Sequence, residues 1–214
     1  MKKIAGFTVT ILIAIFGFAM AVEAKTYDLV LVHGLTNKHQ WSDAFLNQVA
    51  ATWGSGNVYV IFTNESTRVW TRTINGRVIY FCGENDFSAG DDTIYTQASL
   101  MRTKILKLQQ SYGLSANFNI IAHSMGGLVS RCYIGRFPYT VAGLVTLGTP
   151  HKGSPLANSG QWIAFFVGAT AATQQLTPSY VNNTFNVAYP VSSARLANSG
   201  KIYTIAGDGR SEEH

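Results

Sequence analysis

An apolar run that ends abruptly in a small polar turn, residues 118–127 (FNIIAHSMGG), constrains the fold of this chain most. The run from Phe118 to Ile121 predicts a buried strand, and the apolar residues from Leu128 onward predict a helix with no loop before it. Only a very tight turn joins a strand directly to a helix. Such a turn strains the backbone of its central residue, Ser124, and requires small residues two positions before and after it.

Ala122 and Gly126 occupy those two positions, so the segment matches the G-x-S-x-G pattern with Ala in the first place. In this pattern the serine hydroxyl stands exposed at the end of a sheet, where it can attack a carbonyl carbon. We therefore take Ser124 as a candidate nucleophile. A glycine-rich turn with a bystander serine is the alternative that the motif alone leaves open.

The first 24 residues are typical of a secretory signal peptide. Two lysines precede an uncharged apolar run from Ile4 to Val22, and a small-x-small site follows at Val22–Ala24. We expect cleavage after Ala24, which leaves residues 25–214 as one α/β domain in the periplasm or outside the cell. An uncleaved membrane anchor is the alternative, because about 20 apolar residues can span a bilayer.

The charge of the chain is mildly basic. It carries 16 Lys and Arg against 11 Asp and Glu, and the resulting formal charge of +5 is spread along the sequence. A nucleic-acid-binding surface needs basic residues gathered on one face, so we expect no nucleic-acid partner.

Two cysteines, Cys82 and Cys132, are present. In an oxidising compartment they could form a single disulfide. We call the tight turn at residues 122–127 the elbow. Cys132 lies eight residues after Ser124 on the predicted helix that follows the elbow, where it could equally be a buried apolar thiol.

Alternating strands and helices predict the class of the fold. Continuous apolar runs, typical of parallel strands covered on both faces, occur at 27–32, 58–62, 118–121, 141–147 and 202–206. Helical spacing of apolar residues occurs at 40–53, at 93–110 and after the elbow. Asn75-Gly76 between two further runs, 69–74 and 77–82, predicts a two-residue hairpin. We predict an α/β fold: a mostly parallel sheet with helices on both faces and a β-hairpin insertion.

Residues 161–172 (QWIAFFVGATAA) are unusually apolar for a surface helix. A buried helix is one interpretation. A mobile flap over an apolar site is the other, because a large exposed apolar patch is typical of a binding surface.

His33, Gly34 and Leu35 directly follow the first predicted strand. Acyl transfer by a serine requires N–H donors aimed at the oxyanion that develops in the transition state. One donor is the backbone N–H after the nucleophile, here Met125, and the second comes from the loop after an early strand, here Leu35. A chance His-Gly dipeptide is the alternative.

Four segments together resemble the bacterial secreted triacylglycerol lipases and esterases of the α/β-hydrolase fold, in particular the true-lipase group with the pseudomonad lipases. The segments are LVHGL at 31–35, AHSMGG at 122–127, TLGTPHKGSPLA at 146–157 and LTPSYVNNTFNVAYP at 176–190. The resemblance implies a carboxylic ester hydrolase that acts on acylglycerols at a lipid–water interface and requires no cofactor for its chemistry. It implies Ser124 as nucleophile, with Leu35 and Met125 as oxyanion donors. It further implies a structural calcium ion in the full-length protein and a secretion chaperone as partner.

The acid and the base of a catalytic triad follow the serine along such chains. Asp208, after the last predicted strand, is the candidate acid; in the lipases that this chain resembles, the acid lies in a later Asp-Gly-rich loop. No histidine of the sequence fits the base, whether His33, His39, His123, His151 or His214. We therefore expect the catalytic histidine beyond residue 214, together with a last strand and helix. We expect the 214 residues alone to be nearly inactive.

Two other kinds of function stay open on the sequence. An acyltransferase or an amidase would use the same serine chemistry with another acceptor or bond. A non-catalytic α/β-hydrolase module would instead bind a lipid surface or an apolar partner through residues 161–172.

Overall fold

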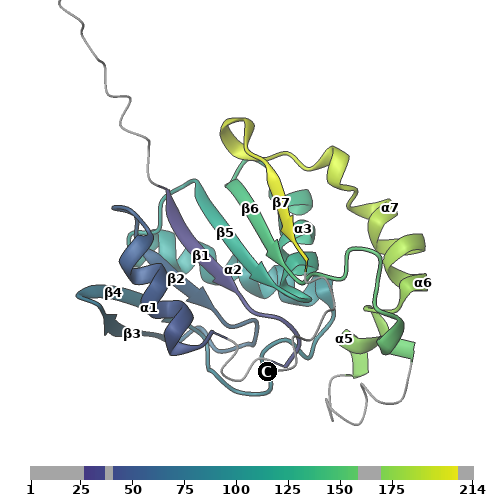
Figure 1. The fold of residues 1–214 in the computed structure, drawn as a ribbon, viewed down its shortest axis with the longest axis horizontal. Helices are drawn as coiled ribbons and strands as arrows, with labels where there is room; N and C mark the ends of the chain where they lie inside the picture. The colour runs from purple at the N-terminus through teal and green to yellow at the C-terminus, as the bar shows by residue number, and fades with distance from the viewer. Residues whose placement is uncertain (1–26, 37–40, 159–169, 207–214) are drawn as a thin grey trace, which may run out of the picture.

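The computed structural model describes residues 27–36, 41–158 and 170–206. These residues form one seven-stranded sheet in the order β3-β4-β2-β1-β5-β6-β7, with helices on both faces (Figure 1). The parallel strands are β1 (Asp28–Val32), β2 (Val58–Ile61), β4 (Arg77–Cys82), β5 (Phe118–His123), β6 (Val141–Leu147) and β7 (Ile202–Ile205). Only β3 (Val69–Ile74) runs antiparallel to its neighbour. The predicted α/β class, with a mostly parallel sheet, is confirmed.

Several predictions concern residues outside this part of the chain. The signal peptide at residues 1–24, positions 161–169 of the apolar segment, and Asp208, His39 and His214 all lie outside the described residues. Within the described residues, no helix combines the length and the apolar character that crossing a membrane requires.

Strand β1 shows why helices cover both faces of the sheet. Its side chains alternate in direction, as in any strand. Leu29 and Leu31 pack in one cluster with α1 (Asp43–Thr52), and Val30 and Val32 pack in another with α2 (Ile94–Ser111) and α3 (Gly126–Arg136). A strand buried on both sides has no polar face, which explains its continuous apolar run.

The two helices before the elbow begin at side chains that accept backbone hydrogen bonds. Ser42 Oγ accepts from the backbone N–H of Phe45 at 3.2 Å, so α1 begins three residues after the predicted start of that helix. Thr93 Oγ1 accepts from the N–H of Thr96 at 3.1 Å and opens α2 where the sequence predicted it. Such caps satisfy N–H groups that the first helical turn leaves free.

The predicted hairpin forms at Asn75-Gly76. Asn75 has a φ of +50° and Gly76 a φ of +74°, the conformation of a two-residue turn whose twist suits a hairpin. β4 also pairs in parallel with β2, so the hairpin extends the central sheet at one edge (Figure 1). At the other edge, β7 leaves Tyr203 and Ile205 each 59% exposed.

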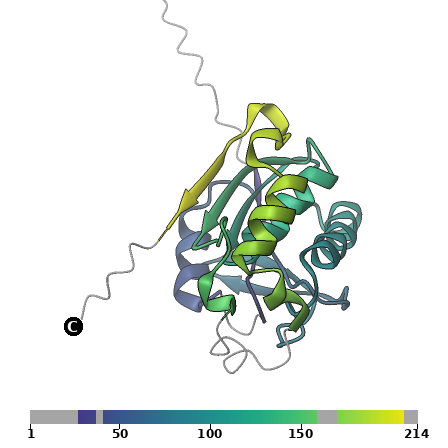
Figure 2. The same cartoon turned by 90° about the vertical axis from the view of Figure 1, so that its right-hand side faces the viewer.

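Along the chain between β6 and β7, residues 178–188 form a helical rod that packs beside α3 (Figure 2). It comprises α6 (Pro178–Tyr180), a π-helical turn η2 (Val181–Phe185) and α7 (Asn186–Ala188). Val181 and Phe185 turn inward and are buried in the cluster that α3 shares. The remaining short helices are η1 (Pro155–Asn158), α5 (Thr170–Gln174), η3 (Val191–Ser193) and η4 (Ala197–Ser199).

Cys82 on β4 and Cys132 on α3 are both buried free thiols. Of the two interpretations drawn from the sequence, the structure therefore has the buried thiol and not the disulfide.

Candidate active site

Ser124 sits in the turn between β5 and α3 with a φ of +51°, in the left-handed region that favours glycine. Its N–H donates to the carbonyl of Leu147 at 2.8 Å, and its own carbonyl accepts from the N–H of Gly127 at 3.1 Å. These two bonds hold a strained residue between β6 and the first turn of α3. The strained strand-to-helix turn predicted for this serine is present.

The small residues around Ser124 allow the close approach that the turn requires. Ala122 is fully buried, paired with Val32 of β1 on one side and Thr146 of β6 on the other. A Cβ atom on Gly126 would lie 2.7 Å from the carbonyl oxygen of Val32 and would collide with that of His33. The first turn of α3 therefore rests on the end of β1, and this contact brings Ser124 beside the loop that follows β1.

The predicted oxyanion donors lie on these two adjoining segments. Leu35 lies two residues after His33, whose carbonyl contacts Gly126, and Met125 begins the turn into α3. Both side chains are buried. Gly90, with a φ of +90°, packs against the same loop, because its Cβ would lie 2.5 Å from the carbonyl oxygen of Gly34. The structure thus brings the two segments together, and the role of the two N–H groups stays a prediction.

His33 holds the loop after β1 through both ring nitrogens. Its Nε2 accepts from the backbone N–H of Thr63 at 2.9 Å, so the proton sits on Nδ1, which donates to the carbonyl of Gly34 at 2.6 Å. The side chain is 1% exposed. Burial lowers the pKa of His33 to about 4, so the ring is neutral at pH 7.

A buried polar network continues from His33 to Met125. Thr63 Oγ1 donates to Gln97 Oε1 at 2.8 Å, and Gln97 Nε2 donates to the carbonyl of Asp92 at 2.6 Å and lies 4.0 Å from Met125 Sδ. Gln97 is 0% exposed. The network joins both candidate oxyanion segments to α2. We did not predict it, although Gln97 falls among the apolar residues of its helix, which was the available signal.

The other two described histidines, His123 and His151, contact side chains of neighbouring segments. His151 accepts at Nδ1 from Arg131 Nη1 at 3.2 Å, and its Nε2 bonds Thr146 Oγ1 at 3.0 Å. Burial and the charge of Arg131 lower the pKa of His151 to about 4. The ring of His123 lies edge-on to Trp41, with ring centroids 6.5 Å apart. His33 and His151 therefore hold neighbouring segments together.

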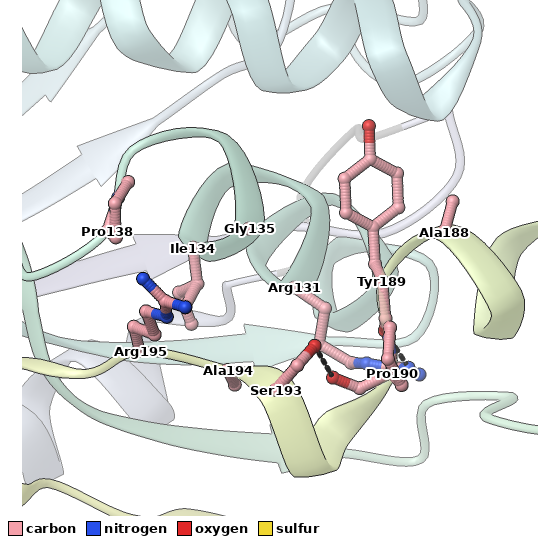
Figure 3. Close-up of a pocket in the computed structure, with 10 residues that line it drawn as sticks. All are labelled: Arg131, Ile134, Gly135, Pro138, Ala188, Tyr189, Pro190, Ser193, Ala194 and Arg195. Carbon is pink, nitrogen blue, oxygen red and sulfur yellow. Dashed lines mark hydrogen bonds between the residues drawn. The ribbon is translucent and has the colours of Figure 1, made fainter.

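Arg131 is buried on α3 and ties the elbow helix to the rod. Its Nη2 donates to Asn186 Oδ1 at 3.0 Å and to the carbonyl of Tyr189 at 2.5 Å. Arg131 and Tyr189 also line a cavity of about 280 Å³, which Arg195 closes on another side (Figure 3). This cavity lies along the later part of α3 and includes no residue of the elbow, so it is separate from the candidate site.

The calcium ion that the resemblance implies stays a prediction. Within 27–36, 41–158 and 170–206, no three His, Cys, Asp or Glu side chains gather in a way that could hold a metal ion.

One protein family matches the part of the chain that contains the elbow. Residues 82–198, more than half of the chain, match the profile of the PGAP1-like alpha/beta domain. The chain belongs to this family. The matched part of the PGAP1-like domain begins at the end of β4 and includes β5, Ser124, Met125 and α3.

Curated relatives of this PGAP1-like domain include bacterial lipases. Over 136 residues, 63% of the chain, it is 29% identical to a triacylglycerol lipase of Pseudarthrobacter phenanthrenivorans and to one of Burkholderia plantarii. The match covers 36% of the first relative and 32% of the second, so the chain spans about a third of their length. The resemblance to bacterial lipases of the α/β-hydrolase fold is confirmed.

Solved structures agree on the fold. The mature lipase BlEst2 of Bacillus licheniformis superposes with a TM-score of 0.56 at 22% identity, covering 85% of this chain and 66% of that one. Phospholipase PlaB of Legionella pneumophila superposes with a TM-score of 0.51 at 17% identity, covering 84% of this chain and 39% of that one. At these identities the likeness shows the α/β architecture of the PGAP1-like domain.

Proposed function

We propose that this PGAP1-like domain is a serine hydrolase that cleaves carboxylic esters, foremost acylglycerols, through an acyl-enzyme on Ser124. The observation that carries the proposal is the φ of +51° at Ser124 between β5 and α3. Holding a non-glycine residue in this region costs of the order of 1–3 kcal/mol, and such strain is typical of functional positions. The triacylglycerol lipases among the relatives support the ester as the bond that is cleaved.

In the proposed reaction, Ser124 Oγ attacks the ester carbonyl carbon while a base removes the hydroxyl proton. The carbonyl oxygen becomes an oxyanion that receives hydrogen bonds from the N–H groups of Leu35 and Met125, each worth roughly 3 kcal/mol in the transition state. The base then protonates the departing alcohol, and water hydrolyses the acyl-enzyme by the reverse sequence. We assign the base to a histidine outside the described residues and keep Asp208 as the candidate acid.

The buried network from His33 to Met125 supports this assignment of roles. It lies behind the loop after β1 that carries Leu35, here called the oxyanion loop. A donor in an oxyanion hole is effective only when it is held in place before the oxyanion forms. His33 fixes the loop that carries Leu35, and Gln97 contacts the side chain of Met125. Both residues act on position, and neither is a candidate for proton transfer because their polar atoms are bonded elsewhere.

Ester hydrolysis tests the proposal directly. The natural protein, purified in its mature form, should hydrolyse p-nitrophenyl butyrate and emulsified tributyrin. Ser124→Ala should lower kcat at least a thousandfold, as expected for loss of a nucleophile. Turnover that survives this substitution would contradict the proposal. Added alcohol that captures the acyl group, or preferential cleavage of the matching amide, would indicate the acyltransferase or the amidase.

We also propose that the protein is exported to the periplasm or beyond. The charged start, the apolar run from Ile4 to Val22 and the small-x-small site support a cleaved signal peptide. Mass spectrometry of the protein from its own cells should find Lys25 as the first residue. A protein that retains Met1 and stays with the cytoplasm would refute this.

A further inference from the structure

A cavity of about 290 Å³ opens on the α1 side of the sheet, and four aromatic side chains are among the residues that line it. Trp41, Phe62, Trp70 and Phe81 line it. It lies where β2 and β4 end, on the same side of the sheet as the cluster that packs against α1. An apolar cavity of about 150 Å³ can hold one benzene ring, so this space suits a ring with a substituent.

Three of the aromatic rings are nearly parallel to one another. The rings of Trp70 and Phe81 stack with centroids 4.1 Å apart and an interplanar angle of 8°. Phe62 is also nearly parallel to both, at 11° to Trp70 and 16° to Phe81. Trp70 is fixed in this orientation because its Nε1 donates to the carbonyl of Gly83 at 3.1 Å. Parallel faces held in this way favour stacking of another planar ring over packing of a flexible alkyl chain.

Trp41 contributes an unused hydrogen-bond donor. Its Nε1 is buried and has no hydrogen-bond acceptor among the residues that the structure describes. An indole N–H usually finds an acceptor when it is buried, so one left without a partner is costly. A ligand that carries an oxygen acceptor would satisfy this donor.

Trp41 also connects the cavity with the elbow. Its ring lies edge-on to His123, which directly precedes Ser124. The mouth of the cavity holds an ion pair in which Arg72 Nη2 lies 2.8 Å from Asp43 Oδ1. Because these charges compensate each other, the mouth favours a neutral group over an ion.

We propose that this cavity binds the neutral aromatic ring of an ester substrate, stacked on Trp70, with an oxygen of the ligand accepting from Trp41 Nε1. The inference rests on the proposed function, since it names the substrate class of the same site. It adds Trp41 and Trp70 as residues that determine specificity for aryl and arylalkyl esters.

Ligand binding without turnover separates this inference from the proposed function. The complete natural protein carrying Ser124→Ala is titrated with benzyl acetate and, as a size-matched control, cyclohexylmethyl acetate, and Kd is measured by calorimetry. A stacked ring should bind roughly two- to tenfold more tightly than the cyclohexyl group. Trp70→Leu should abolish this preference. Tyr203→Leu removes an exposed aromatic side chain at the opposite edge of the sheet and should leave the preference unchanged.

A second variant keeps the test decisive if Trp70→Leu does not fold. Trp41→Phe retains a ring but removes the N–H, so it should weaken benzyl acetate several-fold and leave toluene, which has no oxygen, unaffected. Equal binding of the benzyl and cyclohexylmethyl esters, or no effect of either variant, overturns the inference. A benzyl preference in a protein that hydrolyses no ester would sink the proposed function and leave the binding site standing.

Discussion

Gly126 shows at the scale of one residue how the elbow is held. Gly126→Ala should lower the free energy of unfolding by about 1–3 kcal/mol, because its Cβ would collide with the carbonyl of His33. Gly148→Ala is the matched control: Gly148 has a φ of +57° with no atom within 4 Å of its Cβ position, so only the backbone term of about 1 kcal/mol applies. Urea unfolding measures both. A Gly126 variant as stable as the Gly148 variant would contradict the close approach.

Gln97 tests the buried network. Gln97→Leu removes the partners of the Thr63 hydroxyl and the Asp92 carbonyl, and a buried group left unpaired costs about 1–3 kcal/mol. We expect a loss of this size in urea unfolding, with slower ester hydrolysis as Met125 and the oxyanion loop loosen. Gln110→Leu, at an exposed position of the same helix, should change stability by only about 0.5 kcal/mol. Equal effects of the two substitutions would argue against a special role of Gln97.

His33 makes stability depend on pH. Its pKa in the folded protein, about 4, lies below the ordinary value of 6.5, so between these values the unfolded chain binds a proton that the folded protein does not. Stability is therefore complete above pH 6.5 and decreases as pH falls toward 4, by up to about 1.4 kcal/mol per pH unit for this one group. Urea unfolding from pH 7.5 to 4.5 measures the slope. His33→Gln should remove the contribution of one bound proton from the slope of stability against pH. An unchanged slope would exclude a buried neutral His33.

At the scale of elements, the two cysteines report on how β4 and α3 are packed. Both thiols are buried, and burial raises the pKa of each, so neither should form the reactive thiolate in the folded protein. Ellman's reagent without reductant should find no rapidly reacting thiol in the folded protein and two after unfolding in guanidinium. Finding none after unfolding would mean that Cys82 and Cys132 are oxidised.

The strands and the elbow could be predicted because their signals are local. A continuous apolar run, Asn75-Gly76 and the small residues around Ser124 each act through immediate neighbours in the chain. The rod at 178–188 was not predicted as a helix, because Val181 and Phe185 are its only buried apolar residues and asparagines separate them. Thr63, which contacts Gln97, and the partners of Arg131 lie tens of residues away along the chain, and sequence spacing does not reveal such contacts.

At the scale of the whole molecule, the candidate site lies at one end of the sheet, where β1, β2 and β5 end. The loop after β1, Thr63 after β2 and the elbow after β5 meet there, because neighbouring parallel strands finish at the same end of the sheet. The aromatic cavity lies at the same end of the sheet, on the face that α1 covers. Position in the sheet, and not proximity in sequence, brings the loop after β1, Ser124 and the aromatic cavity to one end of the sheet.

Covalent labelling of the natural, complete protein tests the central claim most directly. A fluorophosphonate reacts with a serine only where the folded site activates the hydroxyl and stabilises the developing charge. We predict one adduct, located by peptide mass spectrometry on Ser124, and its loss in Ser124→Ala and in unfolded protein. An adduct on another serine, or an unlabelled Ser124 in the folded protein, would contradict the account.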